Sequence, residues 1–172
     1  MPHRLEPLIR EIPDFPKPGI IFKDITPLLA DAAGLALAVE LMANPFRKAD
    51  IDLVVGAESR GFIFGTAVAQ SLNCGFVPVR KPGKLPAERK AQTYDLEYGQ
   101  DTLEIHADAM TVGHRVLMVD DLLATGGTMK ACCDLVESLG ASIVGVSVLI
   151  ELGFLNGRVR LAPHEVAAVL RY

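Results

Sequence analysis

The segment VLMVDDLLATGGTMK, residues 116–130, joins an apolar run, two adjacent carboxylates, a small-residue loop and a helix-like segment. The apolar run predicts a buried strand, and the segment after the loop predicts a helix. Gly126 and Gly127 lack a Cβ atom, so the backbone between these elements can turn tightly and present its N–H groups to an anion. A helix that begins near Thr128 adds free N–H groups and the positive end of its dipole. The segment therefore predicts a strand–loop–helix unit that binds a phosphate group.

The polar side chains around this loop fit a phosphorylated sugar. Thr125 and Thr128 offer hydroxyl donors, and Asp120 and Asp121 at the strand end can accept hydrogen bonds from sugar hydroxyls. A glycine pair after a strand is by itself a common connection, and an aspartate there often only caps a helix or is solvated. Neither GxxxxGK[ST] nor GxGxxG occurs in this segment, so it is not one of the two most familiar phosphate loops. The complete segment, residues 116–130, is a much more specific signal of ligand binding than its two glycines alone.

The rest of the chain alternates strand-like and helix-like segments. The expected helices cover 32–46, 62–72 and 129–139, and the expected strands cover 52–56, 75–80, 115–120, 143–152 and 166–170. This alternation predicts an α/β fold with a mostly parallel, twisted sheet and helices on both faces. Ligands bind beyond the carboxyl ends of the strands in such sheets. The Glu58–Arg60 turn, the Arg80–Lys84 loop and the 120–128 loop should therefore share one rim.

Two segments depart from the alternation. The stretch IPDFPKPGIIFKDITPLL, residues 12–29, is too rich in proline for a helix and predicts a fixed, irregular loop. Residues 81–100 form a long polar excursion, with hairpin-like alternation in TYDLEY and in the nearby TLEIH. An excursion of this length suits a lid over a site.

Composition limits the class of protein. A chain of 172 residues, half of them hydrophobic, is the size of one soluble domain. The net charge of −4 argues against broad nucleic-acid binding, which depends on a basic field. The longest apolar run, residues 143–150, is far shorter than the roughly 18 residues that span a bilayer. We therefore expect neither a nucleic-acid partner nor a membrane.

The cysteines and histidines show no metal-binding spacing. Cys74, Cys132 and Cys133 match neither a zinc pattern nor CxxC, and adjacent cysteines on a helix do not readily bridge, which favours a reducing cytoplasm. The N-terminal segment lacks the apolar core of a signal peptide. The histidines are scattered, so we expect no metal site made by the protein alone; they are His3, His106, His114 and His164.

Five strings occur in the order found in the type I phosphoribosyltransferases, and together they look like the members of that family that use adenine. They are FPKPGIIFKDITPLL, AESRGF, RKPGKLP, YDLEYG and DDLLATGGT, and the similarity runs from about Ile12 to Leu161. It implies a single domain, 1–172, of the type I phosphoribosyltransferase fold. Residues 12–30 would form a base-binding hood, 81–100 a flexible lid and 116–130 the motif that binds 5-phosphoribosyl-1-diphosphate (PRPP). The implied reaction is purine salvage, in which adenine and PRPP give AMP and diphosphate.

The resemblance also implies roles for single residues. The loop from Ala124 to Thr128 would hold the 5′-phosphate, the adjacent acids the ribose hydroxyls, and the basic loop the diphosphate, from the same subunit or from the partner in a homodimer. The expected PRPP-binding residues are Ser59, Arg60, Arg80, Lys81, Lys84, Asp120, Asp121, Ala124, Thr125, Gly126, Gly127 and Thr128. Phe22 and Leu155 would cover the two faces of adenine, while Ile21 and Lys23 would contact its edge, largely through backbone groups. Mg²⁺ would arrive mainly with PRPP.

Glu97 in YDLEYG is the candidate catalytic residue. Adenine must lose a proton when its N9 displaces diphosphate from C1′, and a glutamate on a closing lid could accept that proton. The lid would also exclude water from a sugar that carries developing positive charge. A glutamate in an exposed hairpin is otherwise usually a surface residue, so this role depends on the resemblance.

Two other functions stay open on the residues alone. A phosphoribosyltransferase for 6-oxopurines commonly has a lysine near the base after the strand that follows the phosphate loop, and VSVLIELGF contains none. A non-catalytic regulator that senses PRPP and binds nucleic acid should carry an added DNA-binding segment or a basic face, and the sequence shows neither. Both comparisons favour the adenine-using enzyme.

Overall fold

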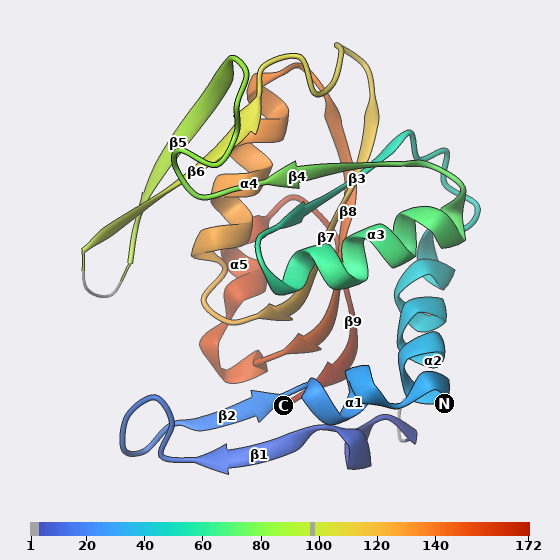
Figure 1. Cartoon of the computed structure of the whole chain (residues 1–172), viewed down its shortest axis with the longest axis vertical. Coiled ribbons are helices and arrows are strands. Elements are labelled where there is room, and N and C mark those ends of the chain that lie inside the picture. The colour runs from blue at the N-terminus through green and yellow to red at the C-terminus, as the bar shows by residue number, and fades with distance from the viewer. Residues whose placement is uncertain (1–3, 97–98) are drawn as a thin grey trace.

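The computed structural model describes residues 4–96 and 99–172, and a five-stranded sheet forms its centre (Figure 1). The strand order is β4-β3-β7-β8-β9, and every neighbouring pair is parallel. The strands are β3 (Leu53–Ala57), β4 (Gly75–Val79), β7 (Arg115–Leu123), β8 (Ser142–Glu151) and β9 (Val166–Arg171). The predicted α/β class and the parallel sheet are confirmed.

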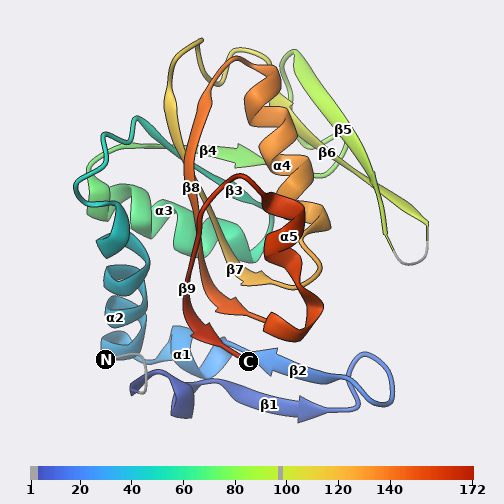
Figure 2. The same ribbon diagram turned by 180° about the vertical axis from the view of Figure 1, so that it is seen from behind.

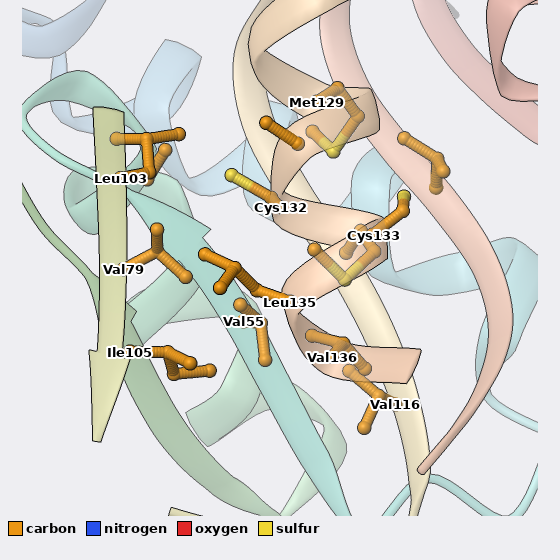
Figure 3. Packing of buried hydrophobic residues seen from close by; sticks show 14 of the residues in the cluster. Val55, Val79, Leu103, Ile105, Val116, Met129, Cys132, Cys133, Leu135 and Val136 are labelled. Atoms are coloured by element: carbon orange, nitrogen blue, oxygen red, sulfur yellow. The ribbon is translucent and has the colours of Figure 1, made fainter. Parts of the chain in front are cut away.

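Helices cover both faces of this sheet. The helices α1 (Thr26–Ala30), α2 (Ala32–Ala43) and α3 (Arg60–Leu72) contribute to the core on one face, and α4 (Gly127–Ser138) and α5 (Gly157–Leu161) to the core on the other. The side chains of β7 alternate between the two cores, because successive residues of a strand point to opposite faces. Val116 and Met118 pack on the α4 side, whereas Leu117 and Val119 pack on the other. Figure 3 shows Leu135 and its neighbours on α4 lying against the strands.

Two antiparallel hairpins extend from this body. The first joins β1 (Arg10–Pro13) to β2 (Ile21–Asp24) and lies at the end of the molecule where the C-terminus emerges (Figures 1 and 2). The second joins β5 (Arg89–Asp95) to β6 (Gln100–His106) and packs beside α4. The predicted hairpin in the 81–100 excursion is therefore confirmed, although it extends to His106. Short 3₁₀ helices complete the described elements: η2 (Glu6–Leu8), η3 (Asn44–Phe46) and η4 (Gly153–Leu155).

The prediction of an irregular loop over residues 12–29 is wrong in part. Strand β2 and helix α1 both lie within this stretch. The prolines do not prevent them, because Pro16 and Pro18 fall in the turn between β1 and β2. Pro27 occupies the first turn of α1, where its missing N–H costs no intrahelical hydrogen bond. Pro45 has the opposite effect on α2. It has no N–H to donate to an α-helical hydrogen bond, so α2 ends at Ala43 instead of continuing to residue 46.

The strand that leads into the phosphate loop is longer than predicted. Pairing with β8 continues past Asp120, since Leu122 lies opposite Ile150 and Leu123 lies opposite Glu151. The two aspartates therefore belong to β7 itself and not to the loop after it. Helix α4 begins at Gly127, two residues before the predicted range 129–139.

The strand order fixes the place of the site. From β3 the chain moves to β4 on one side, and the next strand of the sheet, β7, lies on the other side of β3. A crevice opens at such a reversal, at the carboxyl ends of the diverging strands, and ligands bind there. None of the helices in residues 4–96 and 99–172 has the length and apolar character needed to cross a membrane.

Candidate active site

A cavity of about 280 Å³ lies at this reversal, between the turn after β3 and the loop after β7. Its lining residues come from the turn after β3 with the first residue of α3, and from the end of β7, the following loop and the start of α4, at the rim that the parallel sheet predicted. They are Glu58, Ser59, Arg60, Asp120, Asp121, Leu122, Leu123, Ala124, Thr125, Gly126, Gly127, Thr128 and Met129. Nine of the twelve predicted PRPP-binding residues therefore line one cavity, and the three that do not are Arg80, Lys81 and Lys84.

The shape of the phosphate loop, residues 124–128, depends on two glycines: Gly126 within the loop and Gly157 at the start of α5. Gly126 has a φ of +83°, and a Cβ atom added to it would lie 2.7 Å from the carbonyl oxygen of Gly157. A Cβ atom on Gly157 would lie 2.3 Å from the carbonyl oxygen of Ala124. The start of α5 thus packs directly on the back of the loop. The first N–H groups of α4 have no intrahelical acceptor, so they are available to an anion in front of it.

The two aspartates form an acidic pair in which Asp121 is buried and Asp120 is half-buried. The side chain of Asp121 is 5% exposed, and its Oδ2 atom lies 3.0 Å from Nε of Arg60. The angles of this ion pair are not those of a hydrogen bond, and Oδ2 has no hydrogen-bond partner among the described residues. Oδ1 of Asp120 accepts a hydrogen bond of 2.8 Å from the backbone N–H of Asp121. The buried oxygen of Asp121 is therefore suited to accept a ligand hydroxyl.

The electrostatics of this pair favour a cation or a proton. Burial raises the pKa of Asp120 well above its usual range, and the charge of Asp121 raises it further. Arg60 forms an ion pair with Asp121, and its positive charge acts in the opposite direction on the pKa of Asp120. The described residues contain no group of three or more metal-binding side chains. Oxygen donors of this kind fit Mg²⁺, provided that the substrate supplies most of its ligands.

Two of the basic residues after β4, Arg80 and Lys81, form ion pairs with carboxylates. Nε of Arg80 donates a hydrogen bond of 2.7 Å to Oε2 of Glu58, and Lys81 forms an ion pair with Asp101. Burial acts to raise the pKa of Glu58, but hydrogen bonds from the Arg80 side chain and the Lys81 backbone hold it below its usual range. Lys84 is exposed on the loop between β4 and β5.

The hood reaches the crevice through Phe22. The guanidinium carbon of Arg60 lies 5.5 Å from the centre of the Phe22 ring, and Phe15 packs edge-on against that ring at 5.2 Å. The side chain of Lys23 is buried, where it pairs with Glu11 and lies 3.7 Å from the centre of the Tyr172 ring. Because neighbouring side chains of a strand point to opposite faces, Lys23 points away from the Phe22 side. This orientation of the side chain leaves the backbone of Lys23 for the base-edge contact that the resemblance implies.

Two of the remaining predicted base-binding residues lie on the surface. Ile21 is exposed on β2, and Leu155 is exposed in η4, directly after β8. Glu97 lies outside the described residues.

Three further residues around the site have roles that the sequence pattern does not indicate. Glu58 holds Arg80, Gly157 supports the phosphate loop, and Tyr94 reaches that loop from β5. Tyr94 lines a second cavity of about 730 Å³ beside the first; both cavities include Thr125, Gly127 and Thr128. The half-buried Tyr94 alternates with exposed Thr93 and Asp95, a period-2 signal visible in TYDLEY.

An ion pair between half-buried Arg158 and buried Glu151 joins α5 to the end of β8, behind the phosphate loop. Both oxygens of Glu151, a residue that is 1% exposed, accept hydrogen bonds of 2.6 Å from Arg158. Arg158 also donates a hydrogen bond of 2.6 Å to the carbonyl oxygen of Val166. The hydrogen bonds from Arg158 lower the pKa of Glu151 below its ordinary value of 4.5, although burial acts in the opposite direction.

We expect Glu151→Gln to lower the free energy of unfolding by about 1–3 kcal/mol at pH 7, because it removes a charged hydrogen-bond acceptor. A lowered carboxylate pKa contributes stability above pH 4.5 that is lost as the pH falls through the folded-state pKa. The difference between wild type and variant should therefore shrink below pH 4.5. Urea unfolding between pH 7 and pH 3 measures it, with the exposed Glu165→Gln as control. A difference that does not change with pH would contradict this assignment.

Comparison with known proteins gives the class first. The sequence model of the phosphoribosyl transferase domain matches residues 24–165. The parallel sheet and the loop at its strand-order reversal thus belong to a phosphoribosyltransferase.

Curated relatives and solved structures then identify the family within this class of enzymes. Adenine phosphoribosyltransferase of Rhodopirellula baltica is 58% identical over 164 residues, covering 95% of this chain and 80% of that protein. The enzyme of Koribacter versatilis is 56% identical over 168 residues, covering 98% and 92%. The adenine phosphoribosyltransferase structure from Thermoanaerobacter pseudethanolicus matches with a TM-score of 0.97 and 50% identity over 100% of both chains. That from Saccharomyces cerevisiae, which contains adenine, matches at 0.93 and 39% over 98% of both. The chain belongs to the adenine phosphoribosyltransferase family.

Proposed function

We propose that the crevice between β3 and β7 transfers the 5-phosphoribosyl group of PRPP to adenine, giving AMP and diphosphate. The main support for this proposal is that two features suited to PRPP lie in the same cavity. A glycine loop at the start of α4 offers free N–H groups, and Asp121 beside it has a buried oxygen without a hydrogen-bond partner among the described residues. The first feature suits a phosphate and the second suits a ribose hydroxyl. The membership of the chain in the family supports the same reaction.

The roles follow the geometry of the cavity. The Ala124–Thr128 loop would hold the 5′-phosphate, and Asp120 and Asp121 would bind the ribose hydroxyls. Arg60 would then exchange its contact with Asp121 for one with the diphosphate, beside Ser59. The cations Arg80, Lys81 and Lys84 would approach the diphosphate from the neighbouring loop.

The reaction forms a bond between N9 of adenine and C1′ of the ribose. The bond from C1′ to the diphosphate oxygen breaks, and diphosphate leaves with the electron pair. Glu97 is our proposed acceptor of the proton that adenine gives up. Phe22 and Leu155 would hold the two faces of the base, and backbone groups of Ile21 and Lys23 its edge. Mg²⁺ bound with PRPP would supply charge neutralisation of the leaving diphosphate.

The setting of the enzyme is part of the same proposal. We infer a homodimer from the resemblance to the family, which light scattering at micromolar concentration would test. We infer a cytoplasmic location from the cysteines, because all three thiols are free and Cys132 and Cys133 are buried.

The direct test mixes the protein with PRPP, Mg²⁺ and one purine base at a time, and separates the products by chromatography. AMP should form with adenine, and no nucleotide should form with hypoxanthine or guanine. Nucleotide formed only from a 6-oxopurine would overturn the substrate, and no nucleotide from any base would overturn the activity.

We expect Asp121→Asn to weaken PRPP binding by about 1.5–3 kcal/mol, which is roughly 10- to 100-fold in Kd, because it removes a charged acceptor for the ribose. Calorimetric titration with Mg²⁺ and PRPP measures the change. The exposed Asp108→Asn removes the same charge far from the cavity and should leave Kd unaltered. An unchanged Kd in Asp121→Asn would show that the ribose assignment is wrong.

A further inference from the structure

The hairpin β5–β6 is connected to the phosphate loop by a chain of side chains. The hydroxyl of Tyr94 on β5 lies 3.2 Å from Oγ1 of Thr128 in the phosphate loop. The same hydroxyl lies 3.3 Å from Oδ2 of Asp101 on β6, and that carboxylate forms an ion pair with Lys81. A continuous series of polar contacts therefore runs from Thr128 through Tyr94 and Asp101 to Lys81.

The position of Tyr94 fits a docking contact. Its ring is half-buried, and a Cβ atom on Gly127 would lie 3.7 Å from its Cδ2 atom, so the ring packs on the loop itself. Burial raises the pKa of Tyr94, which keeps the hydroxyl protonated at neutral pH. The hairpin thus touches the phosphate loop through a neutral group that both donates and accepts hydrogen bonds.

The chemistry of hydroxyl groups makes this series sensitive to what the loop holds. A hydroxyl carries one proton, so Thr128 can donate to Tyr94 or to a phosphate, but not to both. When Thr128 donates to a phosphate, its oxygen can still accept a hydrogen bond from the Tyr94 hydroxyl, which then no longer donates to Asp101. The hydrogen bonds around Asp101, and with them the hold on Lys81, therefore change when the loop is filled.

We propose that Tyr94 is a positioning residue for phosphoribosyl transfer, which docks the β5–β6 hairpin on the phosphate loop and links occupancy of that loop to the placement of Lys81. This inference rests on the proposed function, in which Thr128 contacts the 5′-phosphate and Lys81 the diphosphate. It assigns to Tyr94 no contact with the reacting atoms.

The test compares Tyr94→Phe with a matched change in the same hairpin. Tyr94→Phe removes only the hydroxyl, whereas Thr93→Val removes the exposed cross-strand contact of 2.9 Å between Thr93 and Thr102, which does not reach the loop. We expect Tyr94→Phe to lower kcat/KM for PRPP about tenfold, the effect of one hydrogen bond to a charged network, and to leave KM for adenine within about twofold. Thr93→Val should match wild type. Equal kinetics in the two variants would overturn the proposal.

A double-mutant cycle separates positioning from a general loss of structure. If Tyr94 acts through Thr128, then Tyr94→Phe should have little further effect on kcat/KM for PRPP in a Thr128→Val background. Fully additive losses would show that Tyr94 acts independently of the loop and would overturn the link.

Hydrogen exchange gives a readout that does not depend on turnover. In the protein without ligand, the amides of 89–95 and 100–106 should exchange faster in Tyr94→Phe than in Thr93→Val, because the hairpin is no longer docked. Equal exchange would overturn the docking contact. Absence of AMP in wild type would instead refute the proposed function, and the exchange comparison would still decide whether Tyr94 holds the hairpin.

Discussion

Gly126→Ala is expected to lower kcat/KM for PRPP by about 100-fold, because it displaces the phosphate loop. The positive φ of +83° at this position costs an alanine about 1–2 kcal/mol. The new methyl group would also lie 2.7 Å from the carbonyl oxygen of Gly157, a backbone atom that cannot rotate away. Either the loop or α5 must move, and the N–H groups that face the phosphate move with it. Steady-state kinetics at varied PRPP concentration measures the loss.

Gly113→Ala provides the matched control for this substitution. Gly113 has a similar φ of +90°, but no atom of the described residues lies within 4 Å of an added Cβ. This variant therefore carries the same backbone strain without the collision, and its turn lies outside both cavities at the loop. We expect a small loss of stability and wild-type kinetics. If the two variants lost equal activity, the effect of Gly126→Ala would come from strain alone and the account of the loop would be wrong.

Glu97→Gln should lower turnover by about 10²–10⁴-fold, the usual contribution of a general acid or base. The substitution keeps the size of the side chain and removes its ability to accept a proton. Because the assigned role concerns adenine and not PRPP, the calorimetric Kd for PRPP should change little. Measurement of kcat together with that Kd distinguishes loss of proton transfer from loss of binding.

A second glutamate of the same excursion tests whether charge alone matters. Glu88 is exposed at the base of the hairpin, so Glu88→Gln removes one negative charge without approaching the crevice. This variant should retain wild-type turnover. Normal turnover in Glu97→Gln would remove Glu97 from the mechanism.

The sheet could be predicted from the sequence because its strands carry a strong local signal. The segments around Val54 and Leu117 are apolar at successive positions, which occurs when both faces of a strand are covered. The rule that ligands bind beyond the carboxyl ends of parallel strands then placed the turn after β3 beside the loop after β7. The observed strand order explains why the site lies there. Strands β4 and β7 lie on opposite sides of β3, and a crevice opens at such a reversal of the strand order.

The features that the sequence did not give depend on contacts between distant residues. Strand β2 forms because Ile21–Asp24 pairs with Arg10–Pro13 across a proline-rich turn, whereas the proline content had predicted a fixed, irregular loop there. The strand pattern placed the segments of Arg60 and Asp121 beside each other, but it could not show that these two side chains form an ion pair. The contact of Tyr94 with Thr128 likewise spans 34 positions. Such pairs become visible only when the strands are placed in space.

Titration of wild-type protein and Gly126→Ala with magnesium-saturated PRPP in a calorimeter tests the central claim, that the loop at the start of α4 holds the phosphate of activated ribose. We expect saturable heat with one PRPP per subunit in wild type, strongly weakened binding in Gly126→Ala, and wild-type binding in Gly113→Ala. Absence of heat in folded wild-type protein, or equal affinity in wild type and Gly126→Ala, would contradict it.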